Sequence, residues 1–532
     1  MPPTFRNTQI VDKTNWNNFH GTIAHQHVPL YSIVDPIVST AGGATASGVR
    51  RHDGLQDILN YCFTQNPVEP LRTVGATWSL SSIIQPKNVI LDPAVFDGIN
   101  RVDATQLTPA YLASVTASGN VPMVVMGGTQ IARLNQKLGE VGLALPTSGA
   151  NDGHRFAGCI ATATHGSAIS YGAVHDAVRG VFLVVSPTEA VFVQPKSNPY
   201  FKDGLRQFLE ASSGFKTRDV QDDDAFFAAM VSLGSLGFVH SVVIETVPLY
   251  QLKQRIIQRP LGDAQVLQAL RTLDTSALHP DIPAKPWHFA VIVAPYASAG
   301  SPGFFVSLMW KVSAAGVPFA GPNTASPMVP SDTGALVAKL AGLLGGPVTG
   351  PILEHVISSQ AASLYPPGDI AAQFPGQVFG QTTLPPGIGS SAEIVVNQAD
   401  SVNALTAIFA GLNAEKANGR YLLGALGVRS VPQTNALLGM NIHPNNCYIE
   451  IPGLRNAEIP LVHKACWDAL DKAKVPYICH WGQLNNLDAG RINTYYGPRV
   501  ARWKAARAAL LTAPNALDVF AAPLLGSVGL HP

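Results

Sequence analysis

The sequence predicts an α+β protein of more than one domain, and three observations support this prediction. A chain of 532 residues is longer than one ordinary hydrophobic core can organise. Apolar residues make up 46% of the chain and charged residues 13%, which indicates a large buried interior. Short β-branched runs and helix-like stretches alternate along much of the chain. We therefore expect strands and helices packed in layers.

Residues 1 to about 50 are polar and then rich in Gly, Ala and Ser, and a regular alternation of apolar runs and helix-like stretches begins near His52. Leu55, Ile58 and Cys62 have helical spacing, and Asp53 precedes them as a plausible N-cap. A later helix is expected to begin at Asp224, which would cap it. Strands are expected at residues 88–93, 121–128, 178–187 and 238–249, with an amphipathic helix at 129–145.

The composition changes near residue 250. Residues 296–390 are rich in Pro, Gly, Ala and Ser and predict long loops with short helices, one of them capped by Ser331 or Asp332. Strands are then expected at 392–398, 420–431 and 446–453, with helices at 401–416 and 456–473. This order predicts a separate α+β layer. A loop and a basic helix complete the pattern between residues 475 and 511.

Charge and cysteine content exclude several classes of function. A formal net charge of +1 gives no electrostatic reason to bind nucleic acid or an anionic membrane. The five cysteines form no CxxC pair, so neither a zinc site nor a disulfide framework is indicated, and no metal is expected. No signal peptide or apolar run of about 20 residues is evident. We expect a cytoplasmic protein without a membrane span.

Small residues concentrate in three stretches where strands are expected to end, at 72–82, 147–168 and 233–240. Small side chains let backbone N–H groups converge on a ligand, and a run of such donors suits a pyrophosphate. Neither GxGxxG nor GxxxxGK[ST] occurs, which argues against a Rossmann or P-loop site. Tight turns in a chain with 48 glycines are the alternative, and composition alone does not decide between the two.

Four motifs follow one another over about 410 residues. They are "RTVGATWSLSS" at 72–82, "GLALPTSGANDGHRFAGCIATATHGSA" at 142–168, "AFFAAMVSLGSLGFVHSVVIETVPL" at 225–249 and "HWGQ" at 480–483. Together they resemble the FAD-binding, PCMH-type domain of the vanillyl-alcohol oxidase superfamily, and most closely its alditol oxidase and aldonolactone oxidase branch. Ala163 stands where this branch usually has glycine.

The resemblance implies a domain plan. Residues 1–250 would form a two-part FAD-binding domain, and residues 251–474 a substrate or cap domain with an antiparallel sheet. Residues 475–532 would return to the FAD domain. It also implies the residues that contact FAD, with Val239 and Ile244 near the adenine. These are Thr73, Val74, Gly75, Ala76, Thr77, Trp78, Ser79, Ser148, Gly149, Gly158, Ala161, Thr162, Thr164, His165, Val239 and Ile244.

Two departures from the family pattern affect the chemistry. Many relatives attach the flavin through a histidine at the position of Trp78, and indole has no nitrogen suited to that linkage. We therefore expect non-covalent FAD, with Trp78 packing in the core or covering the flavin edge. Gln483 replaces a lysine that helps to hold the reacting hydroxyl group in relatives.

The resemblance also implies the catalytic and substrate-binding residues. Hydride transfer from an alcohol carbon needs a group that takes the hydroxyl proton and donors that hold the oxygen. Glu450 or His480 would be the base, and Gln483 would donate a hydrogen bond. Pro452 occupies the position of a family arginine, although Arg455 is near and could bind substrate. His154 could reach the flavin or the substrate.

The leading functional prediction is an FAD-dependent oxidoreductase that oxidises a CH–OH group of a polyol, sugar or aldonolactone by hydride transfer to flavin N5. Oxygen or another acceptor would reoxidise the flavin. One alternative keeps the flavin but takes an apolar alcohol, such as a sterol-like or aromatic compound, in a pocket lined by the Pro- and Gly-rich middle. Another is a redox-inactive flavin-binding scaffold.

Overall fold

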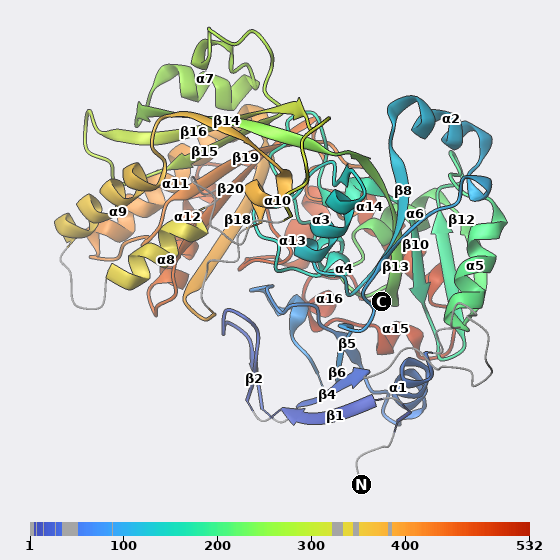
Figure 1. The fold of residues 1–532 in the computed structure, drawn as a ribbon. Helices are drawn as coiled ribbons and strands as arrows, with labels where there is room; N and C mark the ends of the chain where they lie inside the picture. Colours follow the sequence, from blue (N-terminus) through green and yellow to red (C-terminus); the bar gives the residue numbers. More distant parts are fainter. Residues whose placement is uncertain are drawn as a thin grey trace.

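The computed structural model describes residues 5–6, 8–13, 15–26, 28–33, 52–87, 89–321, 333–343, 350–380 and 386–531. Figure 1 shows helices and strands mixed throughout the chain, with one large sheet on the left, a second on the right and a small sheet at the bottom. The expected helix caps Ser331 and Asp332 lie outside the described residues. No helix of the described part is long and apolar enough to cross a membrane.

The first sheet positions the first small-residue loop. Its order is β1-β4-β6-β5, and β6 pairs in parallel with both β4 and β5. Because β5 ends at Thr73, its chain runs directly into residues 74–82 at the sheet edge. The elements of this region are β1 (Thr8–Lys13), β4 (Val28–Ile33), β5 (Leu71–Thr73), β6 (Val89–Asp92), the hairpin strands β2 (Trp16–Asn17) and β3 (Ala24–His25), and α1 (Asp53–Thr64).

The second sheet forms the centre of the largest hydrophobic core. It has the order β12-β11-β10-β13-β8-β7, with β9 paired to β13, and all its ladders are antiparallel except β11–β12. Its strands are β7 (Ile99–Arg101), β8 (Val121–Met126), β9 (Leu143–Ala144), β10 (Val178–Val184), β11 (Glu189–Gln194), β12 (Lys216–Gln221) and β13 (Phe238–Pro248). Val, Ile and Phe side chains of these strands are almost fully buried, as expected for a sheet covered on both faces.

Helices cover this sheet, and two predicted caps need correction. The helices are α2 (Pro109–Ser118), α3 (Ile131–Glu140), α4 (Phe156–Ala161), α5 (Asp203–Ser213) and α6 (Asp223–Met230). Asp222, not Asp224, caps α6, because its carboxylate accepts the backbone N–H of Ala225 at 2.8 Å. Asp224 lies in the first turn and pairs with Arg502. Asp53 is the first residue of α1 rather than its N-cap.

The third sheet is built from strands after residue 249, and every ladder in it is antiparallel. Its order is β17-β14-β16-β15-β19-β20-β18-β21. The strands are β14 (Tyr250–Pro260), β15 (His288–Val293), β16 (Pro302–Ser313), β17 (Gly368–Gln373), β18 (Gly389–Asn397), β19 (Leu426–Pro432), β20 (Asn445–Leu454) and β21 (Ile478–Cys479). The prediction of loops and short helices for 296–390 was wrong at β16 and β17. At β16 the average composition of the region concealed the largely apolar run at 304–310.

Helices beside the third sheet form a second core with it (Figure 1). They are α7 (Ala264–Thr272), α8 (Gly334–Leu343), α9 (Gly350–Leu364), α11 (Ser401–Ala417) and α12 (Ile459–Lys472). Helix α10 (Pro375–Phe379) packs instead in a smaller cluster with Tyr250, Leu252 and Met309. Single 3-10 turns lie at Ser82–Ile84, Ala104–Gln106, Val174–Ala177, Ser276–Leu278 and Gln398–Asp400.

The C-terminal helices return to the core of the second sheet. Trp503 and Leu525 are fully buried in the same hydrophobic cluster as strands β8, β10 and β13. The guanidinium of Arg507 donates to the carbonyl of Ser235 at 2.9 Å, which ties this segment to the loop before β13. The helices are α13 (Ala489–Tyr496), α14 (Pro498–Leu510), α15 (Ala516–Val519) and α16 (Pro523–Ser527).

Candidate functional site

Two neighbouring cavities make up the candidate site. The first, which we name the loop cavity, encloses about 850 Å³ of empty space, part of it open to solvent. It is lined by the three small-residue stretches, chiefly residues 72–79, 157–162 and 234–239. The expected binding loops therefore do converge on one space.

The loop after β5 offers a run of free backbone donors to this cavity. Among the described residues, none of the five N–H groups from Gly75 to Ser79 donates a hydrogen bond to protein. Thr77 has a φ of +58°, in the left-handed region, so the loop turns sharply and its amides do not form a strand ladder. Consecutive free N–H groups in such a turn form a concavity that suits an anion.

Arg72 adds a positive charge to the same cavity. Its guanidinium is almost fully buried and donates to the carbonyls of Leu233 and Gly234 at 3.1 and 3.2 Å. No carboxylate of the described residues pairs with it, and its Nε has no partner. Burial lowers the pKa of Arg72 to about 10. A buried cation without a counter-charge is costly, so this arrangement favours an anionic ligand.

Trp78 lies where the two cavities meet and lines both of them. Its indole stacks on Phe19 with ring centroids 4.2 Å apart and an interplanar angle of 11°. His20 meets the same indole edge-on at 5.6 Å, and His154 lies tilted against it at 4.9 Å. The hairpin that follows β1 therefore packs directly on the first binding loop.

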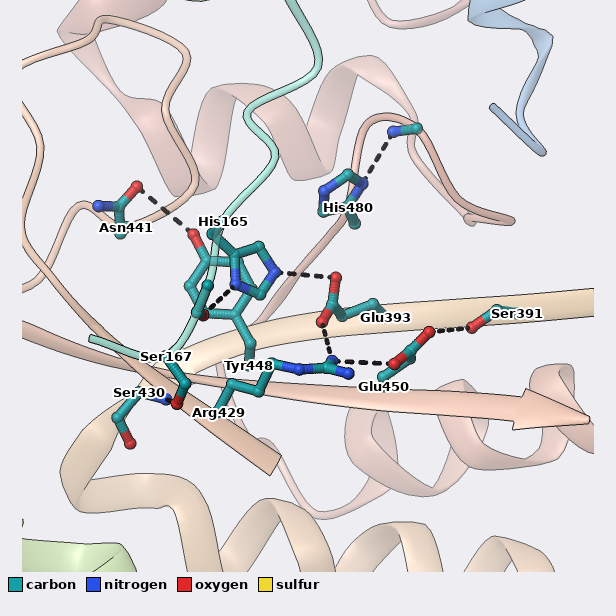
Figure 2. Close-up of polar contacts among 12 residues, drawn as sticks. His165, Ser167, Ser391, Glu393, Arg429, Ser430, Asn441, Tyr448, Glu450 and His480 are labelled. Carbon is teal, nitrogen blue, oxygen red and sulfur yellow. Dashed lines mark hydrogen bonds and ion pairs between the residues drawn. The ribbon is translucent and has the colours of Figure 1, made fainter. Parts of the chain in front are cut away.

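The second cavity, the charged cavity, encloses about 1180 Å³ of empty space, including space open to solvent. Its walls come from segments far apart in the chain, with Gly149, Thr164 and His165 from the second motif and Gln483 from the last. Figure 2 shows the polar contacts on one side of it. The residues that carry charge or proton-transfer groups are His20, His154, His165, Glu393, Arg429, Glu450 and His480.

A chain of ion pairs crosses this wall. His165 Nε2 lies 3.2 Å from a carboxylate oxygen of Glu393, whose other oxygen is 3.4 Å from the Arg429 guanidinium. Arg429 also pairs with Glu450 at 2.9 Å, and the Ser391 hydroxyl donates to Glu450 at 3.1 Å (Figure 2). Two carboxylates thus share one guanidinium, which holds them in fixed positions.

Strand register explains why these groups meet. Glu393 of β18 and Glu450 of β20 are directly opposite each other in an antiparallel ladder, which would be unfavourable for two like charges alone. Gly427 of β19 is opposite Glu450, two residues before Arg429. A Cβ at Gly427 would lie only 3.3 Å from the Arg429 guanidinium and 3.4 Å from the Glu450 carboxylate. The missing side chain leaves the space in which the arginine bridges both glutamates.

The His165–Glu393 pair must hold a proton between its two partners. His165 Nδ1 faces the carbonyl of Gly166 at 2.9 Å, and a carbonyl only accepts, so this nitrogen carries hydrogen. In a neutral ring Nε2 would then be an acceptor facing a carboxylate. A proton between them removes that conflict. Burial alone would raise the pKa of Glu393, but His165, His480 and Arg429 together lower it to about 2.

His480 presents an N–H group. The backbone N–H of Gly482 donates to His480 Nδ1 at 3.0 Å, so the ring is neutral and its hydrogen is on Nε2. Burial lowers the pKa of His480 to about 4, which agrees with a neutral ring. Ligand atoms of His165, Glu393 and His480 lie within 4.8 Å of one another. Because neither nitrogen of His480 then offers a free lone pair, the cluster suits proton handling better than metal binding.

The structure brings most of the sequence-predicted residues to these two cavities. Four of them line both cavities: Trp78, Ser79, His154 and Thr162. Three predicted residues line neither cavity: Ile244 is fully buried in the core, Ser148 bonds to its neighbour Gly149, and Arg455 packs over Gly21. Those in the loop cavity are Thr73, Val74, Gly75, Ala76, Thr77, Gly158, Ala161 and Val239, and those in the charged cavity are Gly149, Thr164, His165, Glu450, His480 and Gln483.

Sequence reasoning missed the two residues at the centre of the charged cavity, Glu393 and Arg429. Each is a charged side chain in the middle of a buried apolar strand, "AEIVVN" and "LGVRSV". Charged residues are rarely buried unless they are paired, so a charge within such a run was a usable signal. Ala163, where relatives usually have glycine, has a φ of +59°, the left-handed conformation that glycine adopts most easily.

Sequence comparison identifies sugar-acid lactone and alditol enzymes as relatives. A putative D-arabinono-1,4-lactone oxidase of Neurospora crassa is 29% identical over 24% of this chain and 19% of its own length. An L-gulono-1,4-lactone dehydrogenase of Mycobacterium tuberculosis is 27% identical over 43% of this chain and 41% of its own. An alditol oxidase of a Streptomyces species is 29% identical over 32% and 33%. The matches thus span less than half of these relatives, and no family model matches the chain.

The fold is shared with solved oxidase structures over the whole chain. Cholesterol oxidase from B. sterolicum superposes with a TM-score of 0.70 at 12% identity, covering 100% of this chain and 99% of that one. A solvent-stable cholesterol oxidase gives 0.67 at 14% identity, covering 99% and 100%. At such identity the likeness establishes the fold alone. With the sequence relatives, it confirms the predicted resemblance to the vanillyl-alcohol oxidase superfamily and its alditol and aldonolactone oxidase branch.

Proposed function

We propose that this chain is an FAD-dependent oxidoreductase that oxidises a CH–OH group of a neutral, hydroxyl-rich molecule such as a polyol, sugar or aldonolactone. One observation carries the proposal: a cavity suited to an anionic cofactor shares Trp78 and Thr162 in its wall with a neighbouring cavity that holds a buried carboxylate–imidazole cluster. The sequence relatives named for aldonolactones and alditols support the same class of reaction.

The residues present fit FAD in the loop cavity. The free N–H groups from Gly75 to Ser79 and the guanidinium of Arg72, which has no carboxylate partner among the described residues, would hold the pyrophosphate. Gly158 has no atom within 4 Å of the place of a Cβ, so the chain leaves open space there. When bound, the flavin supplies the hydride acceptor. Trp78 offers no nucleophile, and we propose that FAD is bound non-covalently.

We assign proton handling to the charged cavity. The His480 N–H would donate to the oxygen of the reacting hydroxyl group and orient it. The Glu393 carboxylate would accept the hydroxyl proton. Its low pKa is compatible with this role, because loss of hydride from the carbinol carbon turns its O–H into a far stronger acid. Arg429 and His165 keep Glu393 ionised and in place. Glu450, with Ser391, would bind further substrate hydroxyl groups.

The polar walls favour a hydroxyl-rich substrate over an apolar one. Alongside its charged groups, the charged cavity is lined by Asn151, Thr333, Ser390 and Ser391. An apolar alcohol such as a sterol would not pair with the groups that still lack a partner here, such as the side-chain oxygen of Gln483, at a cost of about 1–3 kcal/mol for each group left buried and unsatisfied. The cluster balances two carboxylates with Arg429 and the proton of the His165–Glu393 pair, so an uncharged substrate is preferred.

Anaerobic reduction of the bound flavin tests the proposal. The FAD-loaded protein is mixed without oxygen with alditols, aldonolactones, sterols and aromatic alcohols, and the flavin absorbance is followed. We expect bleaching by members of the first two groups. Bleaching by sterols or aromatic alcohols alone would favour an apolar substrate, and no bleaching by any donor would favour a redox-inactive binding protein. Admitting oxygen to the bleached protein then shows whether oxygen serves as the acceptor.

A further inference from the structure

We infer that the hairpin after the first strand supplies a substrate-binding residue, His20, and that the substrate carries a hydroxyl group on a carbon other than the reacting one. This inference rests on the proposed function and deepens it, because it names a binding subsite and the chemical group that the subsite recognises. His20 lies outside all four sequence motifs and lines the charged cavity.

The hairpin is fixed to the binding loop, so His20 has a defined position. Asn18 donates to the carbonyl of Ser79 at 2.7 Å, and the Thr22 hydroxyl donates to that of Leu80 at 3.0 Å. Between them, the Phe19 N–H donates to the carbonyl of Thr77 at 2.8 Å. With the Phe19–Trp78 stack, these bonds hold the residues on both sides of His20 against the loop.

His20 has unused hydrogen-bonding capacity in the cavity. The residue is only 6% exposed, and its ring nitrogen Nδ1 is buried without a hydrogen-bond partner among the described residues. Burial, with His154 and Arg455 nearby, lowers the pKa of His20 to about 4, so the ring is neutral near pH 7. A neutral imidazole has one donor and one acceptor. Buried polar groups without partners are rare in folded proteins, and one that lines a cavity points to a ligand.

Gln483 provides a second unsatisfied group in the same cavity. Its side-chain oxygen is buried without a partner. The segments that carry Gln483 and His20 both attach to residues 79–81: the Leu80 N–H donates to the carbonyl of Gly482 at 2.7 Å, and the Ser81 hydroxyl donates to that of Trp481 at 2.6 Å. Imidazole and amide each donate and accept, as does a hydroxyl group. A neutral polyhydroxy compound would satisfy both.

Binding of two compounds that differ only in internal hydroxyl groups tests this inference. Threitol and 1,4-butanediol share a four-carbon chain with terminal hydroxyls, and only threitol has the internal ones. Affinities are measured by calorimetry on the FAD-loaded protein after dithionite reduction without oxygen, so that no turnover occurs. We expect the unaltered protein to bind threitol more tightly than butanediol.

Variants of the hairpin identify the residue responsible. His20→Phe keeps an aromatic ring against Trp78 but removes both nitrogens, and should weaken threitol binding about tenfold while leaving butanediol binding unchanged. His20→Asn restores a donor and an acceptor and should recover part of the loss. His25→Phe changes a histidine of the same hairpin that does not line the cavity, and should have no effect. An unchanged flavin absorbance spectrum shows that the loop remains intact.

Two results would overturn the inference: equal affinity of the unaltered protein for the two compounds, including no binding of either, or equal effects of His20→Phe and His25→Phe on threitol binding. The proposed function fails separately. Selective threitol binding that depends on His20, together with no bleaching by any alcohol in the oxidised protein, would retain the subsite and reject the oxidoreductase.

Discussion

At the scale of single residues, the site depends on how its buried charges are compensated. Glu393 is only 2% exposed, and such a carboxylate is tolerated only with close partners. Arg429 and the proton shared with His165 supply them, and they make the ionised form of Glu393 the stable one. Arg72 in the loop cavity is the opposite case, because its charge has no counter-charge in the described chain.

Replacing Glu393 with glutamine should separate chemistry from binding. The amide has almost the same shape but cannot take a proton, so flavin reduction by the substrate should slow by about 10²–10⁴-fold. Stopped-flow reduction without oxygen measures this rate. Glu450→Gln is the matched control on the opposite strand, and its effect should fall mainly on substrate affinity. If Glu450→Gln slows reduction and Glu393→Gln does not, the assignment of the base is reversed.

Replacing Arg72 with methionine should weaken FAD binding. Methionine fills much of the same volume, so the loss of FAD affinity reports the missing charge and its hydrogen bonds. We expect a loss of about 1.5–3 kcal/mol, or roughly 10- to 100-fold in Kd. Titration of the apoprotein with FAD gives this constant. Arg155→Met is the matched control, since Arg155 lines the same cavity but already pairs with Asp92 at 3.4 Å. Equal losses in both variants would show that Arg72 has no special role.

At the scale of elements, the loop at 74–82 links the two cavities. Its backbone lines the loop cavity, and its Trp78 side chain lies where the two cavities meet and stacks on Phe19. A rigid aromatic stack at this point can hold a planar ligand edge in place by shape, without a covalent bond. The small residues of the loop thus serve the backbone surface of the loop cavity, and its single tryptophan serves the boundary between the cavities.

Acid precipitation should release the flavin from this loop. We expect the yellow colour to stay in the supernatant, because Trp78 offers no atom for attachment. Trp78→Ala should then lose FAD on gel filtration faster than Trp78→Phe, which keeps an aromatic ring for the stack with Phe19. Absorbance of the protein fraction measures retention. A yellow pellet would mean that another residue binds the flavin covalently.

Local patterns predicted the binding loops but not the charged cavity. Residues 72–79 are contiguous, so their small side chains and spacing were visible in the sequence. Glu393, Arg429 and Glu450 meet only because β18, β20 and β19 are neighbours in a sheet whose order does not follow the chain. Strand order and register depend on long-range packing, which no local pattern encodes. The same limit concealed β16 within a Pro- and Gly-rich region.

At the scale of the whole molecule, the site is assembled from both ends of the chain. His20 comes from the first hairpin and His480 from a segment that precedes the C-terminal helices. Helices α13 to α16 pack in the core of the second sheet, and Arg507 ties them to the loop before β13. Formation of the site should therefore require the complete fold, and global stability and site integrity should change together.

Acid should unfold the protein through its buried histidines. Burial lowers the pKa values of His20, His463 and His480 to about 4 and that of His288 to about 3, against 6.5 in the unfolded chain. Between these limits the unfolded state binds more protons than the folded state. The stability contributed by these neutral rings is thus fully present above pH 6.5 and is lost as the pH falls toward 4.

The slope of this loss can be measured. With four such histidines, the free energy of unfolding should fall by about 5 kcal/mol per pH unit near pH 5.5. Urea titrations at several pH values measure this slope. His463→Gln tests the origin of the slope. Its amide can keep the 2.8 Å bond that His463 Nε2 donates to the carbonyl of Ile451, yet it does not titrate. This variant should lower the slope by about 1.4 kcal/mol per pH unit. A flat profile between pH 7 and 5 would show that these rings are protonated in the folded protein, and the tautomer assigned to His480 would then be wrong.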